Sequence, residues 1–252
     1  MSTQLPPPKR TTSMNITSSG HLLCDSYLTT IGIPTGLSGV GGIGMGIQEF
    51  DPFGVGPAAD FKRAFLRYLI GSRHWRSDPV SASEMVVESW RGRVDMALFN
   101  GHLHAFEIKS DADRLDRLPD QIRRMMRHFD SVGVVCGDRH LDKVGAVVEA
   151  IGEGRVGVYL VAADGTVRQK RPSRIVAVKE PLALVSFLVR DDIEVAFERD
   201  RVPYRKDEYA YILRQQATDI RPSILRSVAM ASLKARFRSR GERLIAALDQ
   251  PL

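Results

Sequence analysis

The chain has 252 residues, of which 43% are hydrophobic and 26% charged, and its formal net charge is +6. This length can bury one α/β core together with a second small domain or a long tail. No stretch approaches the roughly 18–20 apolar residues of a membrane span, and the start lacks the order of a signal peptide, so we expect a cytoplasmic protein with no membrane partner. Cys24 and Cys136 are too few for a disulfide framework or a cysteine zinc site.

The positive charge is concentrated in the last quarter of the chain. Residues 201–252 contain 11 Lys and Arg against 5 Asp and Glu, so residues 1–200 are neutral overall. A basic helical surface of this kind could bind a polyanion, whereas a solvated helix face that binds nothing is the alternative.

The N-terminal region, residues 1–56, is rich in Gly, Pro and Ser, and we expect a mostly irregular arm. Residues 39–44 match the pattern GxGxxG, but no helical pattern opens at the third glycine, as a dinucleotide site requires. We therefore predict a turn-rich segment there and no nucleotide site.

Residues 57–180 have the pattern of an α/β core. Pro57 suits a first helical position and Gly71 ends the apolar stripe that follows. A strand near 85–90, a hairpin of strands 93–99 and 102–109, a helix from Pro119 and a buried strand over 132–136 are expected next. A helix near 141–151, a strand near 155–162 and a return strand near 174–178, after the turn Asp164-Gly165, complete the core.

Residues 181–252 are predicted to form a helical, basic C-terminal region. Apolar residues at spacings of three and four predict helices over 182–189, 193–198, 208–216 and 222–248.

The hairpin around Asn100-Gly101 carries the residues of chemical interest, Asp95, Glu107 and Lys109. A strict two-residue loop would place Asp95 and Glu107 on opposite faces of the sheet. A three-residue loop, Phe99-Asn100-Gly101, with Gly101 left-handed and a bulge, would place both acids and Lys109 on one face. We expect that bulge or an equivalent irregularity, because it separates polar from apolar residues better.

Two carboxylates held together would suit Mg²⁺ or Mn²⁺, and the Ile108 carbonyl could add a ligand. Such an ion can polarise a phosphodiester and lower the pKa of a bound water, while Lys109 would position that water or stabilise the transition state. The spacing alone is weak, since a cross-strand charge pair is the commoner explanation.

Asp95 and Glu107-Ile-Lys109 on consecutive strands, with a helix before and a helix and strand after, resemble the PD-(D/E)XK nuclease superfamily. The longer string from Arg93 to Gln121 looks like a bacterial subgroup whose members are mostly uncharacterised, and the similarity covers about residues 57–145. The resemblance implies a restriction-endonuclease-like αβββαβ core, a central mixed sheet flanked by helices, a divalent metal at Asp95 and Glu107, and phosphodiester hydrolysis with Lys109 as catalytic lysine.

The sequence departs from the superfamily pattern at the first helix, which often carries a glutamate. Between residues 57 and 72 there is Asp60 and no Glu. Glu88 is the preferred substitute, with Glu84 behind it, and either could instead be an exposed strand residue. Gln121 falls where the superfamily often has a polar helix residue near the metal-bound water or phosphate; a simple first-turn hydrogen bond is its alternative role.

The resulting hypothesis is a Mg²⁺-dependent nuclease acting on DNA, with RNA as an open alternative because no 2′-hydroxyl reader is identified. A non-enzymatic nucleic-acid-binding or assembly protein that retains the nuclease fold is the competing hypothesis. Double-strand cutting would favour a homodimer. The predicted nucleic-acid contacts are Arg93, Arg117, Arg124, Arg226, Lys234, Arg236, Arg238 and Arg240.

Overall fold

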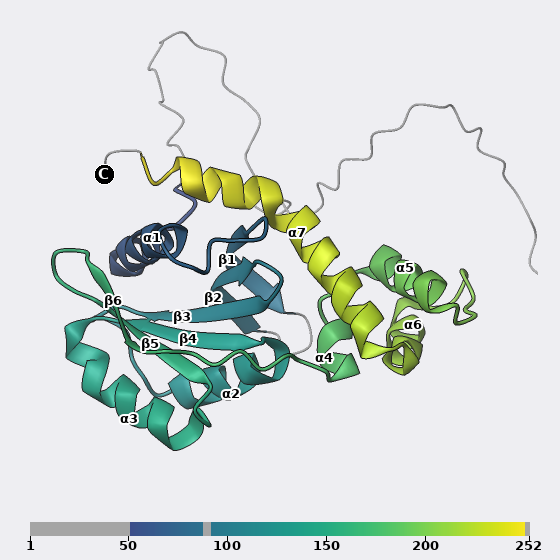
Figure 1. The fold of residues 1–252 in the computed structure, drawn as a ribbon, viewed down its shortest axis with the longest axis horizontal. Helices are drawn as coiled ribbons and strands as arrows, with labels where there is room; N and C mark the ends of the chain where they lie inside the picture. The colour runs from purple at the N-terminus through teal and green to yellow at the C-terminus, as the bar shows by residue number, and fades with distance from the viewer. Residues whose placement is uncertain (1–50, 88–91, 250–252) are drawn as a thin grey trace, which may run out of the picture. The chain divides into compact units, whose positions relative to one another are not determined.

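The computed structural model describes residues 51–87 and 92–249, which belong to one compact unit. The predicted arm up to residue 50, with its GxGxxG segment, and Glu88 lie outside the described residues. Helix α1 precedes three strands, after which α2 leads into a fourth strand (Figure 1). This αβββαβ order and the α/β class, a central mixed sheet flanked by helices, are as the sequence predicts.

The central sheet has six strands in the order β1-β2-β3-β4-β5-β6. The β3–β4 and β4–β5 pairs are parallel, and the other three pairs are antiparallel. The strands are β1 (Val80–Val87), β2 (Gly92–Phe99), β3 (Leu103–Lys109), β4 (Ser131–Cys136), β5 (Val156–Val161) and β6 (Val167–Arg171).

Seven α-helices accompany this sheet in the described part of the chain. They are α1 (Pro57–Ile70), α2 (Leu118–His128), α3 (Leu141–Ile151), α4 (Pro181–Val185), α5 (Arg190–Asp200), α6 (Ala210–Gln216) and α7 (Pro222–Ala246). None of the described helices is long and apolar enough to cross a membrane. The sequence-based division after residue 180 falls inside the compact unit, because α7 packs along β1.

Apolar residues bury both faces of the sheet. On one face, Phe65 and Leu69 of α1 pack on Phe106 of β3 and Tyr159 of β5. On the other, Ile122 of α2 and Val144 of α3 belong to a larger cluster that continues into α4–α7. Figure 1 shows α1 on one side of the sheet and α2 and α3 on the other. Strand β3 is therefore buried along its whole length.

The β2–β3 register confirms that the two acids belong to one face of the sheet, but it corrects the position of the loop. Phe99 pairs with Leu103, so the three-residue loop is Asn100–His102 and not Phe99–Gly101. Gly101 has φ +100°, a conformation that favours glycine. Ala97 pairs with Ala105, and because side chains alternate between the faces of a sheet, Asp95 and Glu107, each two residues further along its strand, belong to the same face.

The return strand after Asp164-Gly165 is β6, residues 167–171, and the prediction of a strand near 174–178 is wrong. The chain turns back directly after the turn, and Val167 already pairs with Val161. Strand β6 has the sequence VRQKR, and its charged side chains suit an edge strand that must resist pairing with other chains.

Helix α7 crosses close to the opposite edge strand, β1. A Cβ at Gly241 would come within 2.7 Å of the Ser81 carbonyl oxygen, so glycine permits this close approach.

Arg226 lies in the first half of α7. Its guanidinium binds the buried carboxylate of Asp130 with an Nη1–Oδ1 distance of 2.8 Å. Asp130 also accepts the N–H groups of Leu103 and Val178. These contacts fix α7 to the core.

Candidate functional site

The candidate site is formed where strands β2 and β3 stop pairing. The β2–β3 ladder reaches Met96 and Phe106, one step before the two acids. Beyond that step, the side chain of Asp95 accepts the Ile108 N–H at 2.8 Å. The carboxylate of Asp95 is thus held by the backbone of the strand that carries Glu107.

Glu107 receives two donors, both from residues that the sequence predicted for the site. Lys109 Nζ lies 2.7 Å from Glu107 Oε1, and Gln121 Nε2 of α2 donates to the same oxygen. Gln121 Oε1 is buried and has no hydrogen-bond partner. Glu107 is 2% exposed and Lys109 is 8% exposed, so this ion pair lies almost out of water. The structure therefore brings Asp95, Glu107, Lys109 and Gln121 together.

Burial raises the pKa of both acids. Burial, then the negative charge of Asp95, raises the pKa of Glu107 to about 7, although Lys109 and Gln121 oppose the shift. Burial also raises the pKa of Asp95, against the lowering effect of the Ile108 N–H. Two acids whose charged forms are both disfavoured would gain from a cation placed between them.

A third acid, Glu84, reaches this region from β1, whereas the preferred candidate Glu88 lies outside the described residues. Ser83 pairs with Met96 and Met85 with Val94, so Glu84 lies across from Asp95. Its φ of +55° is unusual for a residue other than glycine. Backbone strain of this kind clusters at functional sites. The β1–β2 register that reveals Glu84 cannot be read from the sequence, because no turn motif fixes it.

Lys62 of α1 was not predicted for the site. Its ammonium pairs with the Glu84 carboxylate, and its charge acts to lower the pKa of Asp95. The available signal was its spacing: Lys62 occupies the apolar stripe of α1 with Phe65, Leu66 and Leu69, and it is 5% exposed. A lysine on a buried stripe needs an anionic partner.

The donor set fits a cation held by two carboxylates and water. Within residues 51–87 and 92–249 there is no group of three or more His, Cys, Asp or Glu side chains arranged to hold a metal ion. Magnesium, however, is commonly bound by one or two carboxylates while it keeps several waters. Asp95 and Glu107 meet that smaller requirement, and the proposed Ile108 carbonyl ligand stays a prediction.

The predicted nucleic-acid contacts fall into two groups. Arg117 and Arg124 are exposed at positions i−4 and i+3 from Gln121, so they flank the site on one face of α2. Arg93 is 63% exposed at its side chain and pairs with Glu84.

The basic residues of α7 mostly serve the fold. Arg226 binds Asp130, Arg236 donates to the Phe187 carbonyl, and both Lys234 and Arg238 pair with Asp78. Arg240 differs, because it lies over the Phe237 ring and forms no ion pair with the described residues. The role of these basic residues of α7 in binding nucleic acid stays a prediction.

The chain also matches a known protein family. The family described as bacteriophage P4 protein cII matches residues 57–251. The chain belongs to the bacteriophage P4 protein cII family. The matched residues include every element from α1 to α7.

Two individual proteins illustrate how far this similarity reaches. Protein cII of Enterobacteria phage P4 is 27% identical over 181 residues, which cover 71% of this chain and 67% of the phage protein. A solved structure, the SPO1766 protein of unknown function from Silicibacter pomeroyi, is 18% identical and covers 61% of this chain and 99% of its own, with a TM-score of 0.37. At that TM-score the second similarity supports no statement about function.

Proposed function

We propose that this cII-family chain is a metal-dependent nuclease that hydrolyses phosphodiester bonds in DNA. The observation that carries the proposal is the pair of acids, half-buried Asp95 and buried Glu107, which lie close enough to interact beside Lys109 and Gln121. Carboxylates kept close at an electrostatic cost, next to a buried lysine, are more typical of active sites than of structural ion pairs. The resemblance to the PD-(D/E)XK superfamily gives the same four residues.

The residues divide the chemistry among them. Asp95 and Glu107 would hold Mg²⁺ or Mn²⁺, which when bound would polarise the phosphodiester and lower the pKa of a bound water. Lys109 would carry a positive charge to the phosphate as negative charge develops there. Gln121 Oε1, buried without a partner, is free to accept a hydrogen bond from the attacking water.

The substrate class follows from the cations around the site. Arg117 and Arg124 flank Gln121 on α2 and can contact phosphates on either side of the scissile bond. DNA is the preferred substrate and RNA the alternative, as in the sequence-based hypothesis. We keep the cytoplasm as the proposed location, and cleavage of both strands would call for a homodimer.

A second candidate, a non-enzymatic nucleic-acid-binding or assembly protein, is favoured by a specific observation. Each acid already has a partner: Glu107 binds Lys109 and Gln121, and Asp95 binds the Ile108 N–H. In this alternative the polar cluster only joins β2, β3 and α2, and the retained nuclease fold carries no chemistry.

Cleavage of labelled linear duplex, circular and single-stranded DNA in Mg²⁺, Mn²⁺ or EDTA separates the two candidates. The nuclease proposal predicts metal-dependent cutting that falls by about 100-fold or more in Asp95→Asn and Lys109→Met. Matched controls are Asp142→Asn on α3 and Lys170→Met on β6, both exposed and with no contact to the carboxylate site among the hydrogen bonds and ion pairs of the described residues. Both controls should cut like the parent protein.

Two results would contradict the nuclease proposal. If the folded protein retards DNA in a gel but cuts none of the substrates with either metal, the non-enzymatic alternative replaces the proposal. If cutting survives in Asp95→Asn and Lys109→Met, the nuclease site lies elsewhere.

A further inference from the structure

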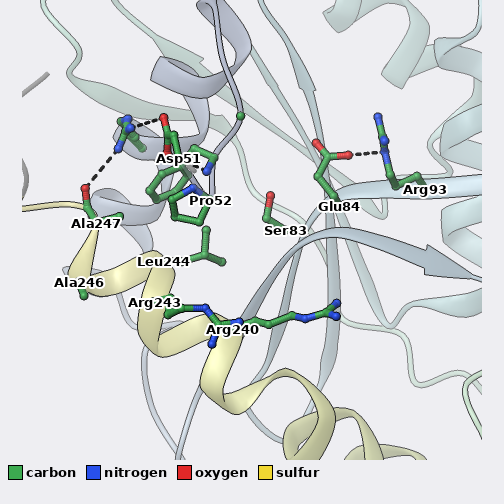
Figure 2. Close-up of a pocket in the computed structure, with 13 residues that line it drawn as sticks. Asp51, Pro52, Ser83, Glu84, Arg93, Arg240, Arg243, Leu244, Ala246 and Ala247 are labelled. Atoms are coloured by element: carbon green, nitrogen blue, oxygen red, sulfur yellow. Dashed lines mark hydrogen bonds and ion pairs between the residues drawn. The ribbon is translucent and has the colours of Figure 1, made fainter. Parts of the chain in front are cut away.

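A large cavity lies beside Glu84, outside the carboxylate site itself. Its volume is about 830 Å³, and its walls come from residues 51–54 before α1, from β1 and β2, and from the last turns of α7 (Figure 2). Ligand cavities for small organic molecules are typically about 300–1,000 Å³. The cavity therefore has room for a molecule of nucleotide size and is too small for a duplex.

The cavity wall carries a positive excess that the fold does not use. Four arginines line it, against two acids: Arg63, Arg93, Arg240 and Arg243 against Asp51 and Glu84. Each acid is already paired, Asp51 with Arg63 and Glu84 with Arg93. The two remaining cations, Arg240 and Arg243, form no ion pair with the residues described.

Arg240 and Arg243 are suited to hold one anion together. They are exposed and three residues apart on α7, so they lie on the same side of the helix. Figure 2 shows both side chains extending along the α7 side of the cavity, with Glu84 and Arg93 on another side. Paired guanidinium groups recognise phosphate oxygens through charge-assisted hydrogen bonds.

The rest of the wall is apolar. Pro52, Phe53, Leu244 and Ala247 line the part of the cavity next to α1 and the end of α7. The Arg63 guanidinium lies 4.7 Å from the centre of the Phe53 ring, which fixes that ring in place. A ligand that fits must carry an anionic group for one half and a flat or apolar body for the other.

We propose that this cavity binds one nucleotide of a single-stranded nucleic acid, with its phosphate at Arg240 and Arg243 and its base against Pro52 and Leu244. Glu84 connects the cavity to the carboxylate site, because it lines the cavity and lies across the β1–β2 pair from Asp95. The strand held here continues past Glu84 toward Asp95 and Glu107. The inference rests on the proposed function for the identity of the strand as substrate.

The test measures binding without cleavage. The probe is a fluorescein-labelled single-stranded oligonucleotide of about 12 nucleotides, titrated with the full chain carrying Asp95→Asn in EDTA, and followed by fluorescence anisotropy over a range of salt concentrations. Adding Arg240→Gln and Arg243→Gln together should weaken binding by about tenfold or more. The slope of log affinity against log salt should fall by about 0.7, because the two arginines share one phosphate contact.

The matched control removes two positive charges elsewhere. Arg168→Gln with Lys170→Gln changes two exposed residues on β6, at the opposite edge of the sheet, and should change affinity by less than about twofold. A second variant, Ala246→Trp, fills the cavity from an exposed position without changing charge, and should also weaken binding. Equal losses in the arginine variant and the β6 control would overturn the proposal.

Competition identifies the source of the nucleotide. If adenosine monophosphate does not displace the labelled oligonucleotide, the cavity binds a nucleotide within a strand. If micromolar adenosine monophosphate displaces it, the cavity binds a free nucleotide with the same chemistry. Displacement by inorganic phosphate as effective as by the mononucleotide would overturn the role of the apolar wall. If the protein cuts no DNA but the arginine variant still loses binding, the assignment of the cavity stands and only the nuclease proposal is rejected.

Discussion

Two buried acidic sites in this protein have opposite electrostatic character. Asp130 receives four hydrogen bonds, from Leu103, Val178 and both terminal nitrogens of Arg226. Burial alone would raise the pKa of Asp130, but Arg226 and the two N–H groups outweigh it and hold that pKa below its usual value. At the Asp95–Glu107 site the same kind of burial prevails, and both pKa values are raised.

The two sites differ in how far hydrogen-bond donors offset the effect of burial on the carboxylates. Asp130 gains enough donors to stay charged, and it joins the start of β4, the segment before α4 and helix α7. Asp95 and Glu107 are held close together with fewer donors, so their charged forms carry an electrostatic cost that the fold does not remove. A site that stays costly in the free protein is the kind that a cation or a substrate can relieve.

Removing Asp130 should have the largest effect on stability. Asp130→Ala leaves the Arg226 guanidinium and two N–H groups without their acceptor, so we expect a loss of about 3–5 kcal/mol in the free energy of unfolding, as for a broken buried ion pair. Urea unfolding followed by circular dichroism measures it. Asp142→Asn is the surface control. A loss below about 1 kcal/mol, the range of exposed ion pairs, would remove Asp130 from its structural role.

Much of the fold could be predicted from local patterns, because most elements have a clear periodicity. Pro57 and Gly71 bound α1 as expected, and the predicted helix at 141–151 is α3. The Asp164-Gly165 turn was also predicted, yet its return strand was misplaced because VRQKR has no apolar alternation. An edge strand selected for charge lacks the pattern by which strands are recognised.

The site was only partly predictable, because it depends on pairing between distant segments. Asp95, Glu107 and Lys109 lie within one hairpin, and the length of its loop determines which face of the sheet each side chain occupies. Glu84 and Lys62 join them through the β1–β2 register and the packing of α1, which no local motif encodes. The partner of Arg226, 96 residues earlier in the chain, was equally hidden, so the structural contact of this arginine was not predicted.

Neutralising Glu107 should raise the free energy of unfolding, whereas removing Asp130 should lower it. The pKa of Glu107 is raised from 4.5 to about 7 in the folded protein, so the folded state binds the proton more tightly than the unfolded state. Stability therefore falls as pH rises from about 4.5 to about 7 and stays lowered above that range. Glu107→Gln removes this penalty, and we expect it to be more stable than the parent by about 1–3 kcal/mol at pH 8.

The measurement is urea unfolding of parent and Glu107→Gln at pH 5 and pH 8. The two proteins should differ little at pH 5, where Glu107 is protonated in the folded state, and should diverge at pH 8. The exposed Glu180→Gln serves as the control. A parent protein whose stability rises across this pH range, with no divergence, would contradict the raised pKa.

A subtler change separates charge from geometry at the structural site. Arg226→Lys keeps the positive charge beside Asp130 but cannot form both hydrogen bonds of the guanidinium. We expect a loss of about 1–2 kcal/mol, smaller than that for Asp130→Ala because the buried acid keeps a counterion. Arg168→Lys on β6 controls for the substitution itself in the same urea experiment. A loss as large as that of Asp130→Ala would mean that geometry alone sustains the pairing.

Magnesium should act on only one of the two sites, and this gives the smallest predicted effect. An ion that binds the folded protein at ten times its dissociation constant stabilises it by about 1.4 kcal/mol. Because Glu107 must lose its proton to bind the ion, the rise in melting temperature should be larger at pH 8 than at pH 5.5 and absent in Asp95→Asn. Arg226→Lys should keep the full response, since Asp130 already has its cation. KCl at matched ionic strength controls for screening. A pH-independent response that survives in Asp95→Asn would show that the ion binds elsewhere, and the unrelieved charge of Asp95 and Glu107 would then need another partner.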